Sequence, residues 1–224
     1  MKLIKTALII SSLIFIFILF NLLFADFITH KFINNLDLSI NSFTPKIENN
    51  FLTVFSEIIA FIVDTITLII ISMIVSIYLW FNNNKKESLF FIVTMLLTSG
   101  FIFVIKNLVQ RVRPINSIIP ETSFAFPSGH VTTAVVFFGL FTYLILIKNK
   151  SKSIKSLILS SSMFMIVLIS FTRLYLNAHW LTDILGGIAF GSFILASFIM
   201  IYKSLPKKPD TVTLKGAKVV NSLF

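Results

Sequence analysis

The chain has 224 residues, of which 56% are hydrophobic and only 12% are charged, and its formal net charge is +10. A soluble domain of this size carries about twice that charged fraction, so the composition excludes an ordinary soluble protein. The sequence contains no cysteine, which excludes disulfides and thiolate metal sites. Several apolar runs reach the roughly 20 residues needed to cross a bilayer. We therefore expect an all-α, polytopic membrane protein that forms a single domain over residues 1–224.

Six transmembrane helices are expected in chain order. The first follows two lysines near the amino terminus; a cleaved signal peptide is the competing interpretation, although the apolar stretch is long for one. The second is long enough to tilt within the bilayer or to project from it. Short polar loops join the later spans, except for the proline-containing stretch 113–126. The six spans cover residues 7–24, 51–81, 89–109, 131–147, 157–172 and 181–202.

The segment 26–50, between the first two spans, has the pattern of an amphipathic helix. Apolar side chains recur in it at near-helical spacing among polar ones, which predicts an interfacial helix in the headgroup layer. Such a helix either guides a lipid tail toward a site or simply anchors and packs. Its apolar positions are Phe27, Ile28, Phe32, Ile33, Leu36, Ile40 and Phe43.

The basic residues indicate how the spans are oriented. Of the 19 lysines and arginines, 13 flank span ends on the side of both termini, and the other 6 lie on the opposite side. Because cytoplasmic loops are enriched in Lys and Arg, we expect both termini and the tail 206–224 to be cytoplasmic, at a cell membrane. Four of the six outer cations belong to the motifs described next, which therefore face outward. Charges that flank spans form no single footprint for nucleic acid, which is not an expected partner.

The first chemical motif ends the third span. Lys106 and Arg113 are seven residues apart, which separates them by about 10 Å along a helix, on nearly the same face. Pro114 then stops the helix. Two such cations are able to bind phosphate, but equally to extend to lipid headgroups without further function. For Arg111, two residues before Arg113, contact with a headgroup and exposure to solvent are both open.

The second motif, Pro127-Ser128-Gly129-His130, opens the fourth span. Gly129 lets the backbone approach a ligand, and free amides at a helix start favour an anion. Ser128 adds a hydroxyl donor, and His130 is placed to give a proton to a leaving oxygen. An ordinary serine-capped helix is the alternative explanation of the same four residues.

The third motif comprises Thr172-Arg173 at the end of the fifth span, followed by His179 and Asp183. The spacing of four places the last two on one face of the first turn of the sixth span. A carboxylate there holds one ring nitrogen of the histidine as N–H and leaves the other free to attack phosphorus. A structural His–Asp pair is the alternative. A metal site fits less well, because the sequence offers no cluster of further ligands.

Two acidic residues stand out in the second span. Glu57 and Asp64 are seven residues apart, and hence on one face of a continuous helix. They line the access route to the site or pair with its cations, or else they belong to a buried ion pair of structural purpose.

Together the three motifs resemble those of the type 2 phosphatidic-acid phosphatase superfamily, a group of integral-membrane lipid phosphatases. The family pattern is Lys, six residues, Arg-Pro; then Pro-Ser-Gly-His; then Ser-Arg, five residues, His, three residues, Asp. This sequence departs from it only at Thr172, which replaces the family serine and keeps a hydroxyl donor. So many matches do not arise by chance when each residue type fills about 5% of positions. The resemblance covers the motif core, residues 89–202, and its six-span topology is the one expected here.

The resemblance implies a two-step transfer of phosphate that uses neither a metal nor another cofactor. His179 attacks phosphorus to form a phosphohistidine, Asp183 holds its ring, and His130 protonates the leaving oxygen and later activates water. Fixed donors and cations neutralise the phosphate oxygens as charge develops. The phosphate-binding set is Lys106, Arg113, Ser128, Gly129, Thr172 and Arg173.

Resemblance to small bacterial members implies a membrane lipid as substrate: undecaprenyl pyrophosphate, phosphatidylglycerophosphate or phosphatidate. We favour undecaprenyl pyrophosphate, which is recycled outside the membrane during wall synthesis, because the motifs are expected to face outward. The alternatives are a phosphotransferase that passes phosphate between lipids on the same site, and a non-catalytic lipid-binding or transport protein. Soluble vanadate-dependent haloperoxidases share the motif, but six spans argue against their chemistry.

Overall fold

The computed structural model describes residues 6, 8–16, 28–44, 47–148 and 151–205. The described residues form helices joined by loops, with no strand among them, as expected for an all-α protein. Residues 8–16 of the first expected span are helical, whereas residues 17–24 and the tail 206–224 lie outside the described ranges. The named helices are α2 (Ile28–Phe43), α3 (Asn50–Ile62), α4 (Thr65–Phe81), α5 (Lys85–Val109), α6 (Gly129–Lys148), α7 (Lys152–Tyr175) and α8 (Leu181–Ser204).

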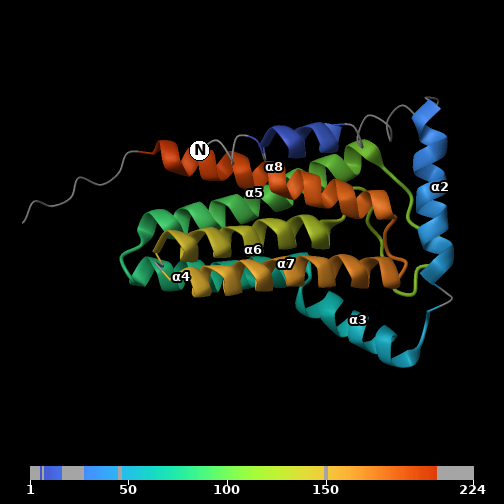
Figure 1. Ribbon diagram of the computed structural model, residues 1–224, viewed down its shortest axis with the longest axis horizontal. Coiled ribbons are helices and arrows are strands. Elements are labelled where there is room, and N and C mark those ends of the chain that lie inside the picture. The colour runs from blue at the N-terminus through green and yellow to red at the C-terminus, as the bar shows by residue number, and fades with distance from the viewer. Residues whose placement is uncertain (1–5, 7, 17–27, 45–46, 149–150, 206–224) are drawn as a thin grey trace, which may run out of the picture.

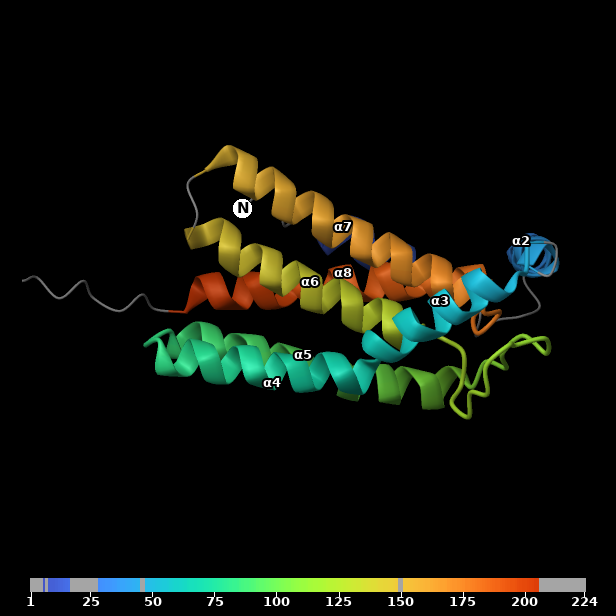
Figure 2. The same cartoon turned by 90° about the horizontal axis from the view of Figure 1, so that it is seen from below.

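Four long helices, α5 to α8, run side by side and form the bundle that carries the motifs (Figures 1 and 2). They are 20 to 25 residues long and apolar enough to cross a membrane, and the bent pair α3–α4 adds a fifth candidate span if counted as one. The described residues thus account for four or five of the six expected spans. Large apolar side chains cover the outside, such as Phe61 and Phe81, each 80% exposed. The chain is a multi-pass membrane protein whose outer surface suits lipid.

The second expected span is not one helix. α3 ends at Ile62, α4 begins at Thr65, and the two are bent by 46°. The break has a local cause, because the Asp64 carboxylate accepts a hydrogen bond from the Ile66 amide at 3.0 Å and so caps the start of α4. The expectation of a continuous helix over 51–81 is therefore wrong, and the apolar residues on both sides of the break conceal it in the sequence.

The two ends of the bundle differ in their charged residues. The motifs lie where α5 and α7 end and where α6 and α8 begin. Lysines lie at the opposite end, where α5 and α7 begin and where α6 and α8 end: Lys85, Lys86, Lys148, Lys152, Lys155 and Lys203. Which side of a membrane each end meets stays a prediction.

Helix α2 lies across the motif end of the bundle, roughly perpendicular to the long helices in both views (Figures 1 and 2). Asn41 donates to the Asn177 side chain at 2.6 Å, and Thr44 donates to the Leu174 carbonyl at 3.4 Å, so α2 is tied to the end of α7 and the turn after it. The amphipathic segment is thus helical over residues 28–43, and its place in the headgroup layer remains a prediction.

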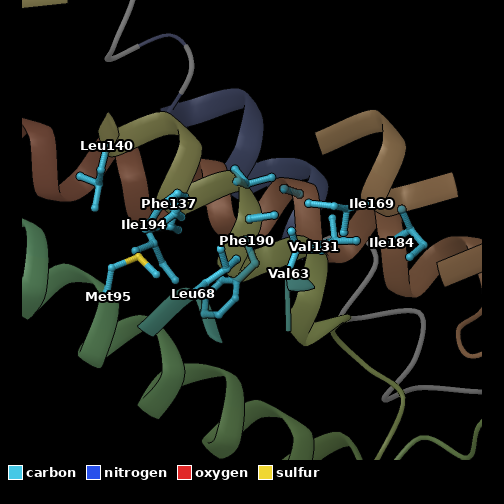
Figure 3. Close-up of a cluster of buried hydrophobic side chains, with 14 of the residues drawn as sticks. Val63, Leu68, Met95, Val131, Phe137, Leu140, Ile169, Ile184, Phe190 and Ile194 are labelled. Atoms are coloured by element: carbon cyan, nitrogen blue, oxygen red, sulfur yellow. The ribbon is translucent and has the colours of Figure 1, made fainter. Parts of the chain in front are cut away.

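The buried core lies between α6, α8 and their neighbours, with side chains such as Phe137 and Ile194 at its centre (Figure 3). Helices α6 and α8 approach closely at glycines of α8. A Cβ on Gly191 would lie 2.9 Å from the Thr132 carbonyl oxygen, and one on Gly187 would lie 3.1 Å from the Ser128 carbonyl oxygen. Small residues permit this approach. It brings the beginnings of α6 and α8 together, and with them the second and third motifs.

Candidate active site

The third motif forms a buried histidine–aspartate pair at the start of α8. His179 Nδ1 lies 3.4 Å from Asp183 Oδ2, but their relative orientation does not complete a hydrogen bond, and Nδ1 has no such partner among the described residues. The expectation that both residues belong to the first helical turn is wrong, because α8 begins only at Leu181. The pair forms instead because Asp183 turns back toward the helix start, where Oδ2 accepts a hydrogen bond from the Trp180 amide at 2.9 Å.

The other ring nitrogen of His179 faces a cation of the first motif. Nε2 lies 3.2 Å from Arg113 Nη1. Burial, and then the positive charges of Arg113, Arg173 and Lys106, hold the pKa of His179 well below its ordinary value of 6.5. The imidazole is therefore neutral at neutral pH. We assign its proton to Nδ1, toward Asp183, which leaves a lone pair on Nε2, as a nucleophile requires.

Lys106 and Arg113 reach the same place from different structural contexts. Lys106 lies in the last turn of α5, but the helix stops at Gln110, which has a left-handed conformation with φ of 50°, and Arg113 lies in the following loop. The expectation that both cations share a helix face is therefore wrong. The loop folds back so that both contact its later residues: Lys106 Nζ donates to the Phe124 carbonyl, and Arg113 Nε donates to the Ser123 carbonyl at 2.7 Å.

Glu121 joins the two motif arginines, and sequence reasoning missed it. Its Oε1 pairs with Arg173, which is 1% exposed, and its Oε2 lies 3.3 Å from Arg113 Nη2. Burial lowers the pKa of Arg113 and Glu121 opposes that shift, while the guanidinium stays charged at neutral pH. A carboxylate between two guanidiniums occupies the kind of position that suits phosphate. The available signal was composition, since Glu121 is the only acidic residue of the loop between α5 and α6.

The second motif lies directly against the third. The Ser128 amide donates to the Asp183 carbonyl at 3.1 Å, and α6 starts at the next residue, Gly129. Ser128 Oγ is buried without a hydrogen-bond partner among the described residues. A Cβ on Gly129 would meet its nearest heavy atom, Thr65 Oγ1, at 3.4 Å, which is an ordinary contact. Packing within the described chain therefore does not by itself require glycine at this position.

The second motif histidine is held by the residue that caps α4. His130 Nε2 lies 3.2 Å from Asp64 Oδ1. Glu57 lies on α3, is exposed, and forms no ion pair within the part of the chain that the structure describes. The expectation that Glu57 and Asp64 share a helix face is wrong because the helix breaks between them. A part for either residue in substrate access stays a prediction.

Arg111 is enclosed by carboxylates. Its guanidinium binds Asp37 Oδ2 at 2.6 Å and Asp183 Oδ1, donates to Thr182 Oγ1 at 2.7 Å, and is 13% exposed. The expectation that Arg111 is exposed to solvent is therefore wrong. Contact of Arg111 with a headgroup stays a prediction. Sequence reasoning missed Asp37. The signal was its position three residues before Ile40, on the apolar stripe of α2, where a carboxylate needs a buried partner.

Unpartnered polar atoms concentrate at this end of the bundle. Five buried side-chain nitrogen or oxygen atoms lack a hydrogen-bond partner among the described residues, and three of them are Ser128 Oγ, Arg173 Nε and His179 Nδ1. Each such atom costs about 1–3 kcal/mol, and native proteins contain few. Thr172 differs from Ser128, because its buried hydroxyl donates to the Ile169 carbonyl at 2.9 Å. With the His179 Nδ1 proton directed toward Asp183, two potential donors without a partner remain, Ser128 Oγ and Arg173 Nε, and they indicate a site built for an oxygen-rich ligand.

The chain is similar to known proteins in sequence. Residues 87–207, more than half of the chain, match the PAP2 superfamily. The chain is 36% identical over 92 residues to the phosphatidylglycerophosphatase B of Bacillus subtilis, a match that covers 39% of this chain and 44% of that relative. It is 26% identical over 150 residues to the undecaprenyl-diphosphatase of Sulfolobus acidocaldarius, which covers 64% of this chain and 68% of that one. The chain therefore spans less than half the length of the first relative.

The fold is similar to a crystal structure, that of the first transmembrane PAP2-type phosphatidylglycerolphosphate phosphatase from Bacillus subtilis. The TM-score is 0.74 at 21% identity, over 88% of this chain and 98% of that one, which shows a common transmembrane fold. The superfamily match includes all three motifs, from Lys106 to Asp183, and these motifs converge at one end of the bundle. The chain belongs to the PAP2 superfamily.

Proposed function

We propose that this protein is a membrane lipid phosphatase that hydrolyses a phosphomonoester or pyrophosphate headgroup through a phosphohistidine, without a metal ion. The observation that carries the proposal is the pair of unpartnered buried donors, Ser128 Oγ and Arg173 Nε, beside two further motif cations and the Nε2 atom of His179. Phosphate oxygens accept several hydrogen bonds at once, and arginine is well suited to supply them. Family membership supports the proposal, since both curated relatives are named as phosphatases of lipid substrates.

The nucleophile of the first step is His179 Nε2. With the proton on Nδ1, toward Asp183, the Nε2 lone pair forms the new bond to phosphorus. The bond between phosphorus and the leaving oxygen breaks, and its electron pair goes to that oxygen. Asp183 stabilises the positive charge that develops on the ring. Arg113, now 3.2 Å from Nε2, is close enough to transfer its hydrogen bond to a phosphate oxygen.

His130 donates a proton in the first step and accepts one in the second. Because Asp64 holds its Nε2, the opposite nitrogen, Nδ1, gives a proton to the leaving oxygen. In the second step the neutral ring takes a proton from water, the water oxygen bonds to phosphorus, and the bond between phosphorus and His179 breaks. Inorganic phosphate is released and both histidines are restored. The cycle consumes one water and needs no oxidant or reductant.

The phosphate oxygens are held by Lys106, Arg113 and Arg173, together with the Ser128 hydroxyl and the Gly129 amide at the start of α6. The carboxylate of Glu121 must leave the two arginines for this to happen. Thr172 contacts phosphate only if its hydrogen bond to the helix backbone breaks, so we place it at the edge of the phosphate site.

The substrate class we favour is undecaprenyl pyrophosphate, acted on at the outer face of a cell membrane with both termini in the cytoplasm. Support comes from the separation of the lysine-rich end of the bundle from the motif end. It also comes from similarity to a protein named undecaprenyl-diphosphatase, while the other relative named above points to phosphatidylglycerophosphate. The whole chain acts as one catalytic domain in this proposal.

The test is phosphate release by the detergent-purified protein in the presence of EDTA. Undecaprenyl pyrophosphate, phosphatidylglycerophosphate and phosphatidate are each compared with the His179→Ala variant. Turnover that survives EDTA and is lost in the variant is the expected result, and the ranking of kcat/KM names the lipid class. No release from any of these lipids by folded protein would overturn the proposal, and turnover abolished by EDTA would overturn its metal-free mechanism.

A further inference from the structure

Asp37 is a buried carboxylate that lies outside the three motifs. It comes from α2, is 2% exposed, and accepts hydrogen bonds from the Thr182 amide (2.9 Å), the Thr182 hydroxyl (2.6 Å) and Arg111 Nη2 (2.6 Å). A buried carboxylate is unfavourable unless it is paired and hydrogen-bonded. All three of these partners belong to the catalytic end of the bundle and none to α2 itself. The negative charge of Asp37 is therefore stabilised by residues of the candidate active site.

Arg111 links Asp37 to the nucleophile pair. Its planar guanidinium holds Asp37 through Nη2 and Asp183 Oδ1 through Nη1, and such a fork fixes both position and angle. The second oxygen of Asp183 accepts from the Trp180 amide and faces His179 Nδ1 at 3.4 Å. A continuous series of contacts thus runs from α2 to the ring of His179.

The same carboxylate also fixes the first turn of α8. The amide of Thr182 is one of the donors that a helix start leaves without an intrahelical partner. Asp37 supplies the acceptor from a different helix, at the end where the helix dipole favours negative charge. Asp183 follows Thr182 in this turn, so Asp37 holds the backbone next to Asp183 and, through Arg111, the Asp183 side chain.

We propose that Asp37 is a positioning residue for the transfer of phosphate. It holds Arg111, and through it Asp183, so that the ring of His179 keeps the orientation needed for attack. This inference rests on the proposed function. It gives α2 a part in catalysis beyond guiding a lipid tail, anchoring or packing, which are the roles that the sequence pattern left open.

A matched control distinguishes positioning from simple docking of α2. Asn41 lies one turn further along the same helix and donates to the Asn177 side chain at 2.6 Å, so it ties α2 to the same turn without touching Arg111. Asp37→Asn keeps the size of the side chain but removes its charge and places an NH2 group against a donor, either Arg111 or the Thr182 amide. Asn41→Ala removes one docking hydrogen bond and leaves the contacts of Arg111 intact.

Trp180 provides a readout that does not depend on turnover. The Arg111 guanidinium lies over its ring, 5.6 Å from the centroid, so a displaced arginine changes the surroundings of this indole. Trp80 is the only other tryptophan of the chain, and the Trp80→Phe background makes Trp180 the single reporter. The emission of Trp180 therefore reports changes around Arg111, and the Asn41→Ala variant controls for a shift of α2, which lies beside the same indole.

The experiment measures kcat, KM, melting temperature and Trp180 emission for the wild type, Asp37→Asn, Asn41→Ala, Arg111→Gln and the double variant Asp37→Asn/Arg111→Gln. Asp37→Asn is expected to lower kcat about 10- to 100-fold, the usual loss when the partner that orients a functional histidine is removed. KM stays within about threefold, because Asp37 acts on the nucleophile and not on phosphate. Arg111→Gln shows a comparable loss, the double variant loses little more, and Asn41→Ala stays within about threefold of the wild type.

Each outcome decides the inference. If Asp37→Asn and Asn41→Ala lower kcat equally, and in proportion to their lowered melting temperatures, Asp37 only docks α2. The same conclusion follows if the kcat losses of Asp37→Asn and Arg111→Gln add up in the double variant. If Asp37→Asn does not fold, Arg111→Gln decides, and full activity in it overturns the inference. If the wild type releases no phosphate from any lipid, that result overturns the proposed function but not the inference about Asp37. Trp180 emission then decides, because an unshifted spectrum in Asp37→Asn shows that Asp37 does not position Arg111.

Discussion

Replacing Asp64 with asparagine is expected to slow the hydrolysis of phosphomonoester lipids more than that of lipid pyrophosphates. Asp64 caps α4 through Oδ2 and holds His130 through Oδ1 at 3.2 Å. Asparagine caps helices about as well as aspartate, so the substitution keeps α4 and removes only the charge that faces the histidine. Without that charge the ring loses the partner that orients it toward the leaving oxygen, which makes it a poorer general acid.

The magnitude follows from the distance and the exposure of this pair. Unit charges about 4 Å apart interact by about 4 kcal/mol near a protein surface and by about 1 kcal/mol in water. Of the Asp64 side chain 36% is exposed, and of the His130 side chain 12%. We therefore expect the interaction energy of this pair to lie near the aqueous limit, at about 1.4 kcal/mol, and the loss of that energy lowers the rate about tenfold. An alkoxide needs a proton as it leaves, whereas phosphate leaves readily as an anion. The tenfold loss is therefore expected for phosphatidate and a much smaller one for undecaprenyl pyrophosphate.

The assay compares kcat on the two lipids for the wild type, Asp64→Asn and Asp64→Ser. Serine keeps the helix cap but carries no charge, so both variants should show the same selective loss at an unchanged melting temperature. Equal losses on both lipids, or full activity on phosphatidate, would refute the role of Asp64 beside the general acid. A lowered melting temperature that accompanies the loss would assign Asp64 to the helix cap instead.

Three further predictions concern the phosphate site. Gly129→Ala should keep the melting temperature, because its Cβ makes only ordinary contacts, yet lower kcat/KM at least tenfold. Gly191→Ala should lower the melting temperature, because its Cβ would lie 2.9 Å from the Thr132 carbonyl oxygen; the reverse pattern would contradict the phosphate-binding role of the Gly129 amide. Glu121→Gln should lower the inhibition constant of inorganic phosphate about fivefold, since the competing carboxylate charge is removed from the arginines; an unchanged constant would show that Glu121 does not compete with phosphate. The ring ¹⁵N shifts of His179, assigned with His179→Gln, should remain those of a neutral imidazole at pH 6.5 and below, because its lowered pKa delays protonation until the pH falls well under that value; half-protonation at or above pH 6.5 would refute the assignment.

The sequence predicted what is encoded by local spacing. His179 and Asp183 form a pair as their spacing of four indicates, even though a helix cap and not a shared helix face brings them together. The contacts that were missed are distant in the chain: Arg111 and Asp37 are 74 positions apart, and Arg173 and Glu121 are 52 apart. No periodicity encodes such pairs, because they depend on how a loop folds back and where α2 crosses the bundle.

The break between α3 and α4 escaped prediction for a related reason. Hydrophobicity reports that a segment is buried in lipid or protein, and it is high on both sides of Asp64, so it carries no information about a bend. The local sign was Asp64, one of two carboxylates inside the apolar run, and its capping bond to the Ile66 amide is the cause of the break. The break also places the Asp64 carboxylate against His130, which a continuous helix has no reason to do.

The balance of charge explains how such a site can exist in an apolar bundle and still attract phosphate. Among the described residues that make up the site, four cations and four carboxylates lie near one another: Lys106, Arg111, Arg113 and Arg173, and Asp37, Asp64, Glu121 and Asp183. With neutral histidines the formal charge is zero, which suits a poorly solvated site. A phosphate dianion adds two negative charges. In the proposed mechanism, movement of Glu121 toward water and protonation of His130 would each offset one of them. Glu121, at 20% exposure, is less buried than the arginines that it pairs with. Under the proposed mechanism we therefore expect phosphate binding to be coupled to release of the arginines and to proton uptake by His130, so that the catalytic state forms when the substrate arrives.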